Sequence, residues 1–329
     1  MLIYIGGKMM KIFIRADGGE KIGIGHIMRT MVLAKELRKD FDVTYICLKC
    51  SEYNQGYEIL KNNGFKIMFI NSKEELLLVK NTIIIFDKYG LEEEYFEKVR
   101  KNENKIVLFD DNCNLKYYIA DIIINQNFYG EELQYNCSEN TKLLLGSKYT
   151  LLREEFRNSE KSIELKKEIK DIMVTVGGSD NNNITEKILN QLVNKNYNIH
   201  IIIGPAFKYQ ERLYKYKNDR INFYKNAIVS EIMKKCDVII SGCGSTVYES
   251  LAMGIPTIPI VLVDNQKKIS EYVKRHKLGK VAEVKDISNI IDEMNYSERV
   301  SYSLKGKLIL DGNGVFRIVN EVKKLAKSS

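Results

Sequence analysis

The sequence predicts an α/β protein of two Rossmann-like domains, each a doubly wound parallel sheet, that face each other across a cleft. Short runs of β-branched and aromatic residues alternate with longer amphipathic segments along the chain. The alternation pauses in a strongly charged stretch, 151–170, and then resumes. The length of 329 residues also suits two domains. Strands that alternate with helices form right-handed βαβ units, and hence parallel sheets covered on both faces.

Six strands are expected in the first half of the chain. They are KIFIRA (11–16), DVTYICL (42–48), FKIMFI (65–70), TIIIF (82–86), KIVLF (105–109) and DIIIN (121–125). The clearest helix follows the first of them at 26–39, where Ile27, Met31, Ala34 and Leu37 lie largely on one face. This order of elements predicts a first domain over 1–158.

Five more strands are expected after the charged stretch. They are DIMVTV (171–176), NIHIII (198–203), RINFY (220–224), DVIIS (237–241) and PTIPIV (256–261). We place the domain boundary inside 155–168 and assign the second domain to 159–329. The last helix, 315–327, is expected to pack back on the first domain. Ligands of such folds bind at the carboxyl ends of the strands, so the cleft should open there.

Composition excludes several classes of protein. With 44% hydrophobic and 29% charged residues and a net charge of +8, the chain can bury two cores and favours anionic ligands only modestly. No nucleic-acid recognition module is present. No stretch reaches the roughly 18 apolar residues of a membrane span, and the first residues lack a signal-peptide core. We therefore expect a soluble, cytoplasmic monomer with no stable membrane association and no nucleic-acid partner.

Two patterns that formally match metal sites are discounted. The pair Cys47-x-x-Cys50 has no second pair and no neighbouring His, as a zinc or redox centre would need. The Asp40-Phe41-Asp42 triplet lies between a helix end and a strand start, away from the expected cleft. We expect no metal and no cofactor.

The first segment that could take part in binding or catalysis runs from Arg15 to Arg29 and joins the first strand to the first helix. Gly23 and Gly25 would let the backbone approach a ligand at the positive end of that helix. A dinucleotide fingerprint would need glycine at position 28, which is Met28, so nicotinamide binding is disfavoured.

His26 stands at the start of this helix. An imidazole there can accept a proton near neutral pH, and the flanking glycines and Arg29 favour this role over a plain helix cap. Asp17, Asp87 or Asp111 could orient the ring. The strand ends Asp87-Lys88-Tyr89-Gly90 and Phe109-Asp110-Asp111-Asn112 carry these groups, and Tyr89 could hydrogen-bond a sugar. An aspartate at a strand end can equally be a turn former.

The second segment is Ser241-Gly-Cys-Gly-Ser-Thr-Val-Tyr-Glu-Ser-Leu-Ala-Met-Gly-Ile-Pro256. Gly244, Ser245 and Thr246 can present amides and hydroxyls to a diphosphate at a helix start, and Glu249 could hold a vicinal diol such as that of ribose. The alternative is that the glycines only tighten the turn.

A third segment, Val176-Gly-Gly-Ser-Asp180, again ends a strand with two glycines. Its residues Gly178, Ser179 and Asp180 could receive sugar or phosphate at the same sheet edge. His200 and His276 have no companion groups and are expected to be structural or solvated.

These motifs together resemble a known family. RADGG, IGIGHIMR, FDKYG, FDDN, ADIIIN, YTLLREEF and VGGSD occur in this order. They are similar to the UDP-2,4-diacetamido-2,4,6-trideoxy-β-L-altropyranose hydrolases of pseudaminic acid biosynthesis, grouped with SpsG-type spore-coat polysaccharide proteins. The segment SGCGSTVYESLAMGIP is similar to the UDP-binding segment of MurG-like glycosyltransferases, which implies the GT-B fold.

The resemblance implies roles for matching residues. The motif histidine, proposed as catalytic in that family, is His26, and the aromatic of the Asp-x-Tyr-Gly motif is Tyr89. Lys88 stands where members of the family can carry His. The candidate catalytic residues are His26, Asp17, Tyr89 and Asp87. The candidate substrate-binding residues are Arg15, Gly25, Arg29, Asp111, Arg153, Gly178, Ser179, Asp180, Gly244, Ser245, Thr246, Glu249, Asn265 and Gln266.

The expected reaction is hydrolysis of a UDP-linked diacetamido-trideoxy amino sugar at its anomeric carbon, with inversion. The first alternative is a GT-B glycosyltransferase that uses the same UDP-sugar donor. The second is a nucleotide-sugar binding protein without catalysis.

Overall fold

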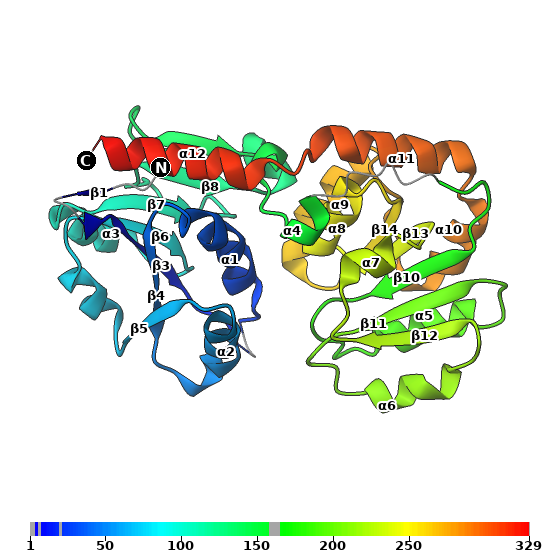
Figure 1. Ribbon diagram of the computed structural model, residues 1–329. Coiled ribbons are helices and arrows are strands. Elements are labelled where there is room, and N and C mark those ends of the chain that lie inside the picture. Colours follow the sequence, from blue (N-terminus) through cyan, green and yellow to red (C-terminus); the bar gives the residue numbers. More distant parts are fainter. Residues whose placement is uncertain (1–3, 6–7, 20–21, 158–164, 329) are drawn as a thin grey trace. The chain divides into compact units, whose positions relative to one another are not determined.

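The structure is a computed structural model, and it describes residues 4–5, 8–19, 22–157 and 165–328. The chain divides into two compact units (Figure 1). The first combines residues 1–153 with 313–329, and the second spans 154–312. The boundary expected at 158/159 falls in the segment 158–164, which lies outside the described residues.

The first unit contains a seven-stranded parallel sheet with the order β5-β4-β3-β6-β7-β8-β9. Its strands are β3 (Lys11–Ala16), β4 (Asp42–Leu48), β5 (Lys66–Ile70), β6 (Ile83–Asp87), β7 (Lys105–Phe109), β8 (Ile122–Asn125) and β9 (Lys142–Leu145). The strands β3 to β8 match the expected ranges within one residue, whereas β9 was not expected. Two short strands, β1 (Tyr4–Ile5) and β2 (Lys8–Met9), form an antiparallel pair.

Helices cover both faces of this sheet. They are α1 (Gly25–Leu37), α2 (Asn54–Asn62), α3 (Glu93–Lys101) and α12 (Gly314–Lys327). Because side chains alternate across a strand, Ile83 and Ile85 of β6 pack in one core with α1, α2 and α12. Ile84 and Phe86 point to the opposite face and pack in a second core with α3. Strands buried on both faces explain why the sequence shows continuous apolar runs.

The last helix, α12, packs against α1 (Figure 1), and His26 lies at the start of α1. Val315, Ile318 and Val322 of α12 are fully buried in the core that they share with α1. The helix begins at Gly314, where a Cβ atom would lie 2.3 Å from the carbonyl oxygen of Thr150. Only glycine permits this close approach.

The second unit contains a five-stranded parallel sheet with the order β12-β11-β10-β13-β14. Its strands are β10 (Asp171–Thr175), β11 (Asn198–Ile203), β12 (Ile221–Lys225), β13 (Val238–Gly242) and β14 (Thr257–Ile260), each within one residue of its expected range. Ile172 and Val174 of β10 face one core, and Met173 faces the other.

The helices of the second unit lie on both faces of its sheet (Figure 1). They are α4 (Glu154–Arg157), α5 (Ile184–Leu192), α6 (Gln210–Leu213), α7 (Val229–Met233), α8 (Ser245–Ala252), α9 (Lys267–Arg275), α10 (Ile287–Glu293) and α11 (Tyr296–Ile309). Within the described part of the chain, no helix is long and apolar enough to cross a bilayer.

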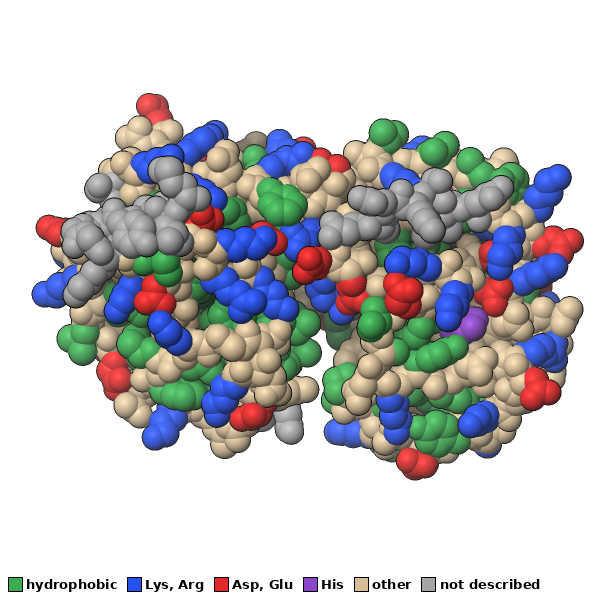
Figure 2. Space-filling model, in the orientation of Figure 1, with side chains coloured by type: hydrophobic (Ala, Val, Ile, Leu, Met, Phe, Trp, Pro, Cys, Tyr) green, Lys and Arg blue, Asp and Glu red, His purple; other side chains and the backbone are tan. Residues whose placement is uncertain are grey.

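Each sheet reverses its strand order beside its central strand, at β3/β6 in the first unit and at β10/β13 in the second. The carboxyl ends at such a reversal are where doubly wound sheets bind ligands. On the face that Figure 2 shows, Lys and Arg side chains are interspersed with Asp and Glu over both units. The candidate residues are therefore best sought at the two strand reversals.

Candidate active site

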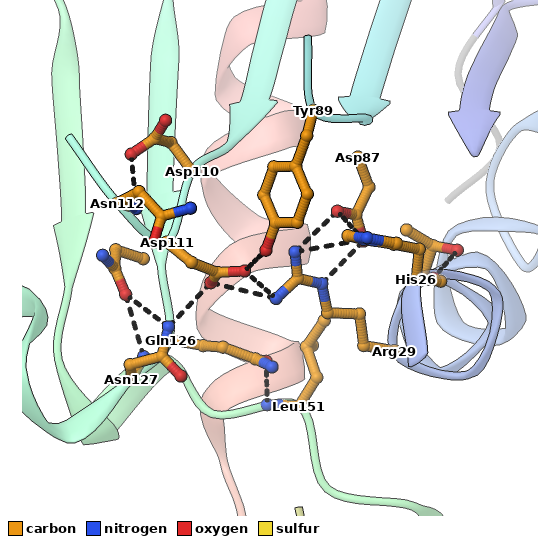
Figure 3. Close-up of polar contacts among 12 residues, drawn as sticks. His26, Arg29, Asp87, Tyr89, Asp110, Asp111, Asn112, Gln126, Asn127 and Leu151 are labelled. Atoms are coloured by element: carbon orange, nitrogen blue, oxygen red, sulfur yellow. Dashed lines mark hydrogen bonds and ion pairs between the residues drawn. The ribbon is translucent and has the colours of Figure 1, made fainter. Parts of the chain in front are cut away.

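Polar side chains gather at the carboxyl ends of four adjacent strands in the first unit. Asp17 follows β3, Asp87 ends β6, Asp111 follows β7 and Asn127 follows β8. The start of α1 brings His26 to the same edge, because α1 follows β3 directly and β3 pairs with β6. Figure 3 shows the side chains of His26 and Asp87 pointing toward each other, and that of Asn127 pointing toward Asp111.

His26 and Asp87 form a direct pair. Nδ1 of His26 lies 2.7 Å from Oδ1 of Asp87 (Figure 3). The Asp87 side chain is fully buried, whereas that of His26 keeps 15% exposure. The residue before α1, Ile24, makes no side-chain cap, and the ring of His26 turns to Asp87. The contact with Asp87 therefore orients the imidazole ring of His26.

Arg29 lies one turn further along α1 and holds the same carboxylate. Its Nε atom donates to Oδ2 of Asp87 and its Nη2 atom to Oδ1, both at 2.6 Å. Burial acts to raise the pKa of Asp87, but Arg29 and His26 hold that pKa below its usual value. Asp87 is therefore an ionised acceptor. It accepts a hydrogen bond from the protonated Nδ1 of His26, which leaves Nε2 as the acceptor of the ring.

Asp111 meets Arg29 from the other side. Nη1 of Arg29 contacts both oxygens of Asp111, at 3.0 and 2.8 Å. Burial acts to lower the pKa of Arg29, but the charges of Asp111 and Asp87 raise it well above its ordinary value. With two carboxylates and one guanidinium, this cluster carries one net negative charge when His26 is neutral.

Tyr89 forms the exposed wall beside this cluster. Its ring meets the ring of His26 edge to face with centroids 4.8 Å apart, and its hydroxyl donates to Oδ2 of Asp111. Burial and the Asp111 charge raise the pKa of Tyr89, so the phenol stays protonated. The side of Tyr89 away from these partners is open, with 48% of the residue exposed.

Asp17 and Arg15 form a separate buried pair at the end of β3. Nη2 of Arg15 donates to Oδ2 of Asp17 at 2.7 Å, and Oδ1 of Asp17 accepts from the amide of Leu48. Nζ of Lys88 lies 3.5 Å from Oδ2 of Asp17. The contacts of Asp17 therefore run to the sheet and to Lys88, and the aspartate that touches His26 is Asp87.

The glycines of the first loop divide into two kinds. A Cβ atom at Gly19 would lie 1.8 Å from the carbonyl oxygen of Glu52, so that glycine is needed for packing. A Cβ atom at Gly23 or Gly25 would meet nothing within 4 Å. Gly25, predicted to bind substrate, thus adjoins open space at the start of α1. Residues 20 and 21 of this loop lie outside the described residues.

The segment YTLLREEF connects to the site through the loop after β8. The amide of Leu151 donates to Oε1 of Gln126 at 2.9 Å, and the Thr150 hydroxyl donates to the Gln126 carbonyl oxygen (Figure 3). Arg153 of this segment is half-buried.

Asn125 and Asn127 were missed as site residues in the sequence. Asn127 is 9% exposed, and its Nδ2 atom donates to Oδ1 of Asp111 at 2.7 Å and to Oδ1 of Asn125 at 2.9 Å. The available signal was the pattern already used for Asp87 and Asp111, a polar residue directly after a buried strand.

Asp110 proved to be the turn former, since Oδ1 accepts from the amides of Asn112 and Cys113.

In the second unit, the predicted nucleotide loop lies between β13 and α8. Gly244 immediately precedes α8, Ser245 is exposed and Thr246 is half-buried. Glu249 is 6% exposed in the middle of this helix. Gln266 lies beside the loop, since a Cβ atom at Gly244 would be 3.7 Å from its Nε2 atom, and its Oε1 atom accepts from the Leu262 amide.

Other second-unit candidates follow the same sheet edge. Gly178 and Ser179 are exposed after β10, and Asn265 is exposed after β14. Asp180 is 6% exposed, and its two oxygens accept from the amides of Ile184 and Thr185 at the start of α5. Its carboxylate therefore caps that helix, and the prediction that it binds substrate has no support in these contacts.

The discounted residues have structural partners. Asp40 pairs with Lys323 at 2.6 Å and Asp42 with Lys66 at 2.8 Å. His200 lies against Tyr224 and Asp171, and His276 stacks on Tyr272.

Known proteins resemble this chain over most of its length. An uncharacterized protein of Methanocaldococcus jannaschii is 34% identical over 286 residues, which cover 81% of this chain. This chain spans only 59% of that relative. SpsG of Bacillus subtilis, a spore coat polysaccharide biosynthesis protein, is 26% identical over 94% of this chain and 96% of its own length. A UDP-2,4-diacetamido-2,4,6-trideoxy-β-L-altropyranose hydrolase of Campylobacter jejuni is 28% identical over 81% of this chain and 97% of its own length.

The chain is similar to SpsG and to this hydrolase over most of its length. Residues 171–298 match the Glycosyltransferase family 28 C-terminal domain. MurG of Acinetobacter baumannii shares its fold, with a TM-score of 0.68 and 14% identity over 96% of this chain and 99% of MurG. Anabaena HepE, solved with UDP-glucose, has a TM-score of 0.60 and 11% identity over 96% of this chain and 99% of HepE. The chain thus has the GT-B fold of two Rossmann-like parallel-sheet domains.

Proposed function

We propose that this protein hydrolyses a UDP-linked diacetamido-trideoxy amino sugar at the anomeric carbon, releasing UDP and the free sugar. The observation that carries the proposal is the His26–Asp87 pair at the strand reversal of the first unit. It provides an oriented, partly exposed base whose ring lies edge to face with the half-exposed Tyr89. The relationship to the Campylobacter jejuni hydrolase supports the substrate class.

The proposed reaction is a single displacement. A water oxygen attacks C1 while the bond from C1 to the diphosphate oxygen breaks, and UDP leaves with the bonding electrons. The proton of the water moves to Nε2 of His26, and the Asp87 carboxylate compensates the positive charge that appears on the ring. Attack opposite to the leaving group inverts the anomeric centre.

We assign recognition of the UDP group to the second unit. The start of α8 offers backbone amides and the Ser245 and Thr246 hydroxyls to the diphosphate, where the helix dipole favours negative charge. Glu249 would accept hydrogen bonds from the ribose hydroxyls. The same groups would stabilise the charge that develops on the leaving diphosphate, so neither a metal nor a cofactor enters the proposed step.

We further propose that the protein acts in the cytoplasm as a monomer and supplies a free sugar for pseudaminic-acid-type nonulosonate synthesis. None of its six cysteines, all of which lie among the described residues, forms a disulfide. This is the state expected in a reducing compartment.

The test is incubation of the purified protein with a panel of UDP-amino sugars, followed by NMR in water enriched in ¹⁸O. Release of UDP without any acceptor, with ¹⁸O at C1 of a sugar of inverted configuration, would support hydrolysis. Binding of every panel member without turnover would leave a nucleotide-sugar binding protein and overturn the proposal.

One observation favours a second candidate, a glycosyltransferase that uses the same donor. Residues 171–298 match a glycosyltransferase family domain. In that reaction His26 would take the proton of an acceptor hydroxyl in place of water. UDP release that depends on an added sugar or lipid acceptor would identify this activity.

A further inference from the structure

The carboxylate of Asp111 is saturated by other side chains of the protein. Oδ1 accepts from Nη1 of Arg29 at 3.0 Å and from Nδ2 of Asn127 at 2.7 Å. Oδ2 accepts from the same Nη1 at 2.8 Å and from the hydroxyl of Tyr89. A carboxylate offers about four acceptor positions, and all are occupied here. Asp111 is therefore poorly suited to accept a hydrogen bond from a sugar hydroxyl.

Asn127 fixes Asp111 from the protein interior. Nδ2 of Asn127 also donates to Oδ1 of Asn125, a fully buried residue that ends β8. Nδ2 of Asn125 in turn donates to the hydroxyl of Tyr135. Asp111 is thus tied to the end of a core strand, and it cannot rotate toward a ligand without breaking these contacts.

The two side chains that Asp111 holds also contact the proposed catalytic pair, His26 and Asp87. Arg29 donates two hydrogen bonds to the Asp87 carboxylate, and the ring centroids of Tyr89 and His26 lie 4.8 Å apart. Tyr89 is half exposed, and its hydroxyl contact with Asp111 is the hydrogen bond that fixes the phenol. If Asp111 were neutral, Arg29 would lose one of its two counter-charges and could turn away from Asp87.

We propose that Asp111, anchored by Asn127, is a positioning residue that sets the geometry of His26 through Arg29 and Tyr89, and is not a substrate ligand. The effect on turnover rests on the proposed function. The effect on the His26 ring does not, because it exists in the protein without substrate.

The variant Asp111→Asn tests this against a matched control, Asp121→Asn. Asp121 also pairs with an arginine of the first unit, Arg100, at 3.1 Å, and the Asp121 side chain is 14% exposed where that of Asp111 is 13%. It precedes β8 and so lies at the amino edge of the sheet. Both variants remove one charge from a partly buried ion pair, but only one touches the His26 network.

The first measurement is ¹⁵N NMR of protein labelled only in histidine, which has three such residues. His26→Asn assigns the His26 signals. Asp111→Asn should shift or broaden them and leave those of His200 and His276 in place, whereas Asp121→Asn should leave all three unchanged. Tyr89→Phe removes one contact from an exposed side chain and should also move the His26 signals, which keeps the test available if Asp111→Asn does not fold.

The second measurement is the split between kcat and KM. Asp111→Asn should lower kcat by about tenfold to a hundredfold, the loss expected from a misplaced reacting group, with KM within about threefold. A raised KM with unchanged kcat and unmoved His26 signals would show that Asp111 binds substrate and would overturn the inference. If no UDP-sugar is turned over by the wild-type protein, the proposed function fails, while the NMR result still decides the role of Asp111.

Discussion

Nδ1 of His26 lies 2.7 Å from Oδ1 of Asp87, 61 positions later in the chain. The two meet because α1 follows β3 and the next strand on that side of β3 is β6, which ends at Asp87. The fully buried Asp87 carboxylate fixes which nitrogen of the ring carries the proton, and the partly exposed ring keeps its other nitrogen as an acceptor.

We expect His26→Asn to lower turnover by about 10²–10⁴, the usual loss when a general base is removed. Asparagine keeps some hydrogen bonding to Asp87 but cannot take up the proton of water. Folding, followed by circular dichroism, and UDP affinity, followed by calorimetry, should persist. The control His200→Asn should stay within a few-fold of wild type, since His200 lies in the second unit against Tyr224. Near-full activity of His26→Asn would show that another group is the base.

The stability that Asp87 provides should depend on pH. Its pKa is lowered in the folded protein, chiefly by Arg29, against an unfolded value of about 3.9. The unfolded chain therefore binds a proton at higher pH, so the stabilisation is complete above about pH 5 and is lost as the pH falls through the folded pKa. Asp87→Asn should cost about 3–5 kcal/mol of unfolding free energy at pH 7, as for other broken buried pairs.

Urea denaturation of wild type and Asp87→Asn at pH 7, 5 and 3 measures this dependence. The difference between the two proteins should narrow toward pH 3. Asp42→Asn is the control, because Asp42 pairs with the largely exposed Lys66 and such pairs contribute about 0–1 kcal/mol. A difference that stayed constant over this range would mean that the Asp87 carboxylate titrates alike in both states.

In the second unit, Glu249→Ala should weaken UDP binding about tenfold or more. The estimate treats the ribose contact as a charge-assisted hydrogen bond of about 1.5–3 kcal/mol. Calorimetry with UDP is the measurement. Glu186→Ala, on α5 and paired with Lys215, is the matched control and should keep wild-type affinity. Equal affinities for both variants would remove Glu249 from the site.

Turnover should survive treatment with EDTA. The helix start of α8 and its hydroxyl-bearing residues are proposed to meet the diphosphate charge, so no divalent ion is needed for UDP to leave. Activity is measured after chelation and dialysis. Complete loss that magnesium or manganese restores would contradict this expectation.

Most of the fold could be predicted because the strands are buried on both faces and appear as continuous apolar runs. The strand of the seven-stranded sheet that was not predicted, β9, has the sequence KLLL and only four residues. Lys142 and Leu143 are exposed, because β9 lies at the edge of the sheet and only one of its sides pairs. A short edge strand bears little of the pattern that marks a buried one.

The site could be predicted only in part. The polar residues after the strands were visible, but the sequence left Asp17, Asp87 and Asp111 equally able to orient His26. The strand order and the rotamers decide among them: Asp17 turns to Arg15, and Asp111 reaches the ring only through Arg29 and Tyr89. Asn127 follows a buried strand as Asp111 does, but it was missed because an amide in a loop does not by itself indicate which group it binds.

The packing of α12 against α1 also orders the folding of the nascent chain. All residues of the second unit, 154–312, leave the ribosome before residues 314–327 do. The second unit can complete its core during synthesis, while the first unit, although begun earlier, lacks Val315, Ile318 and Val322 until residues 314–327 have been made. The helix that carries His26 therefore gains this packing partner only after the whole second unit has been synthesised.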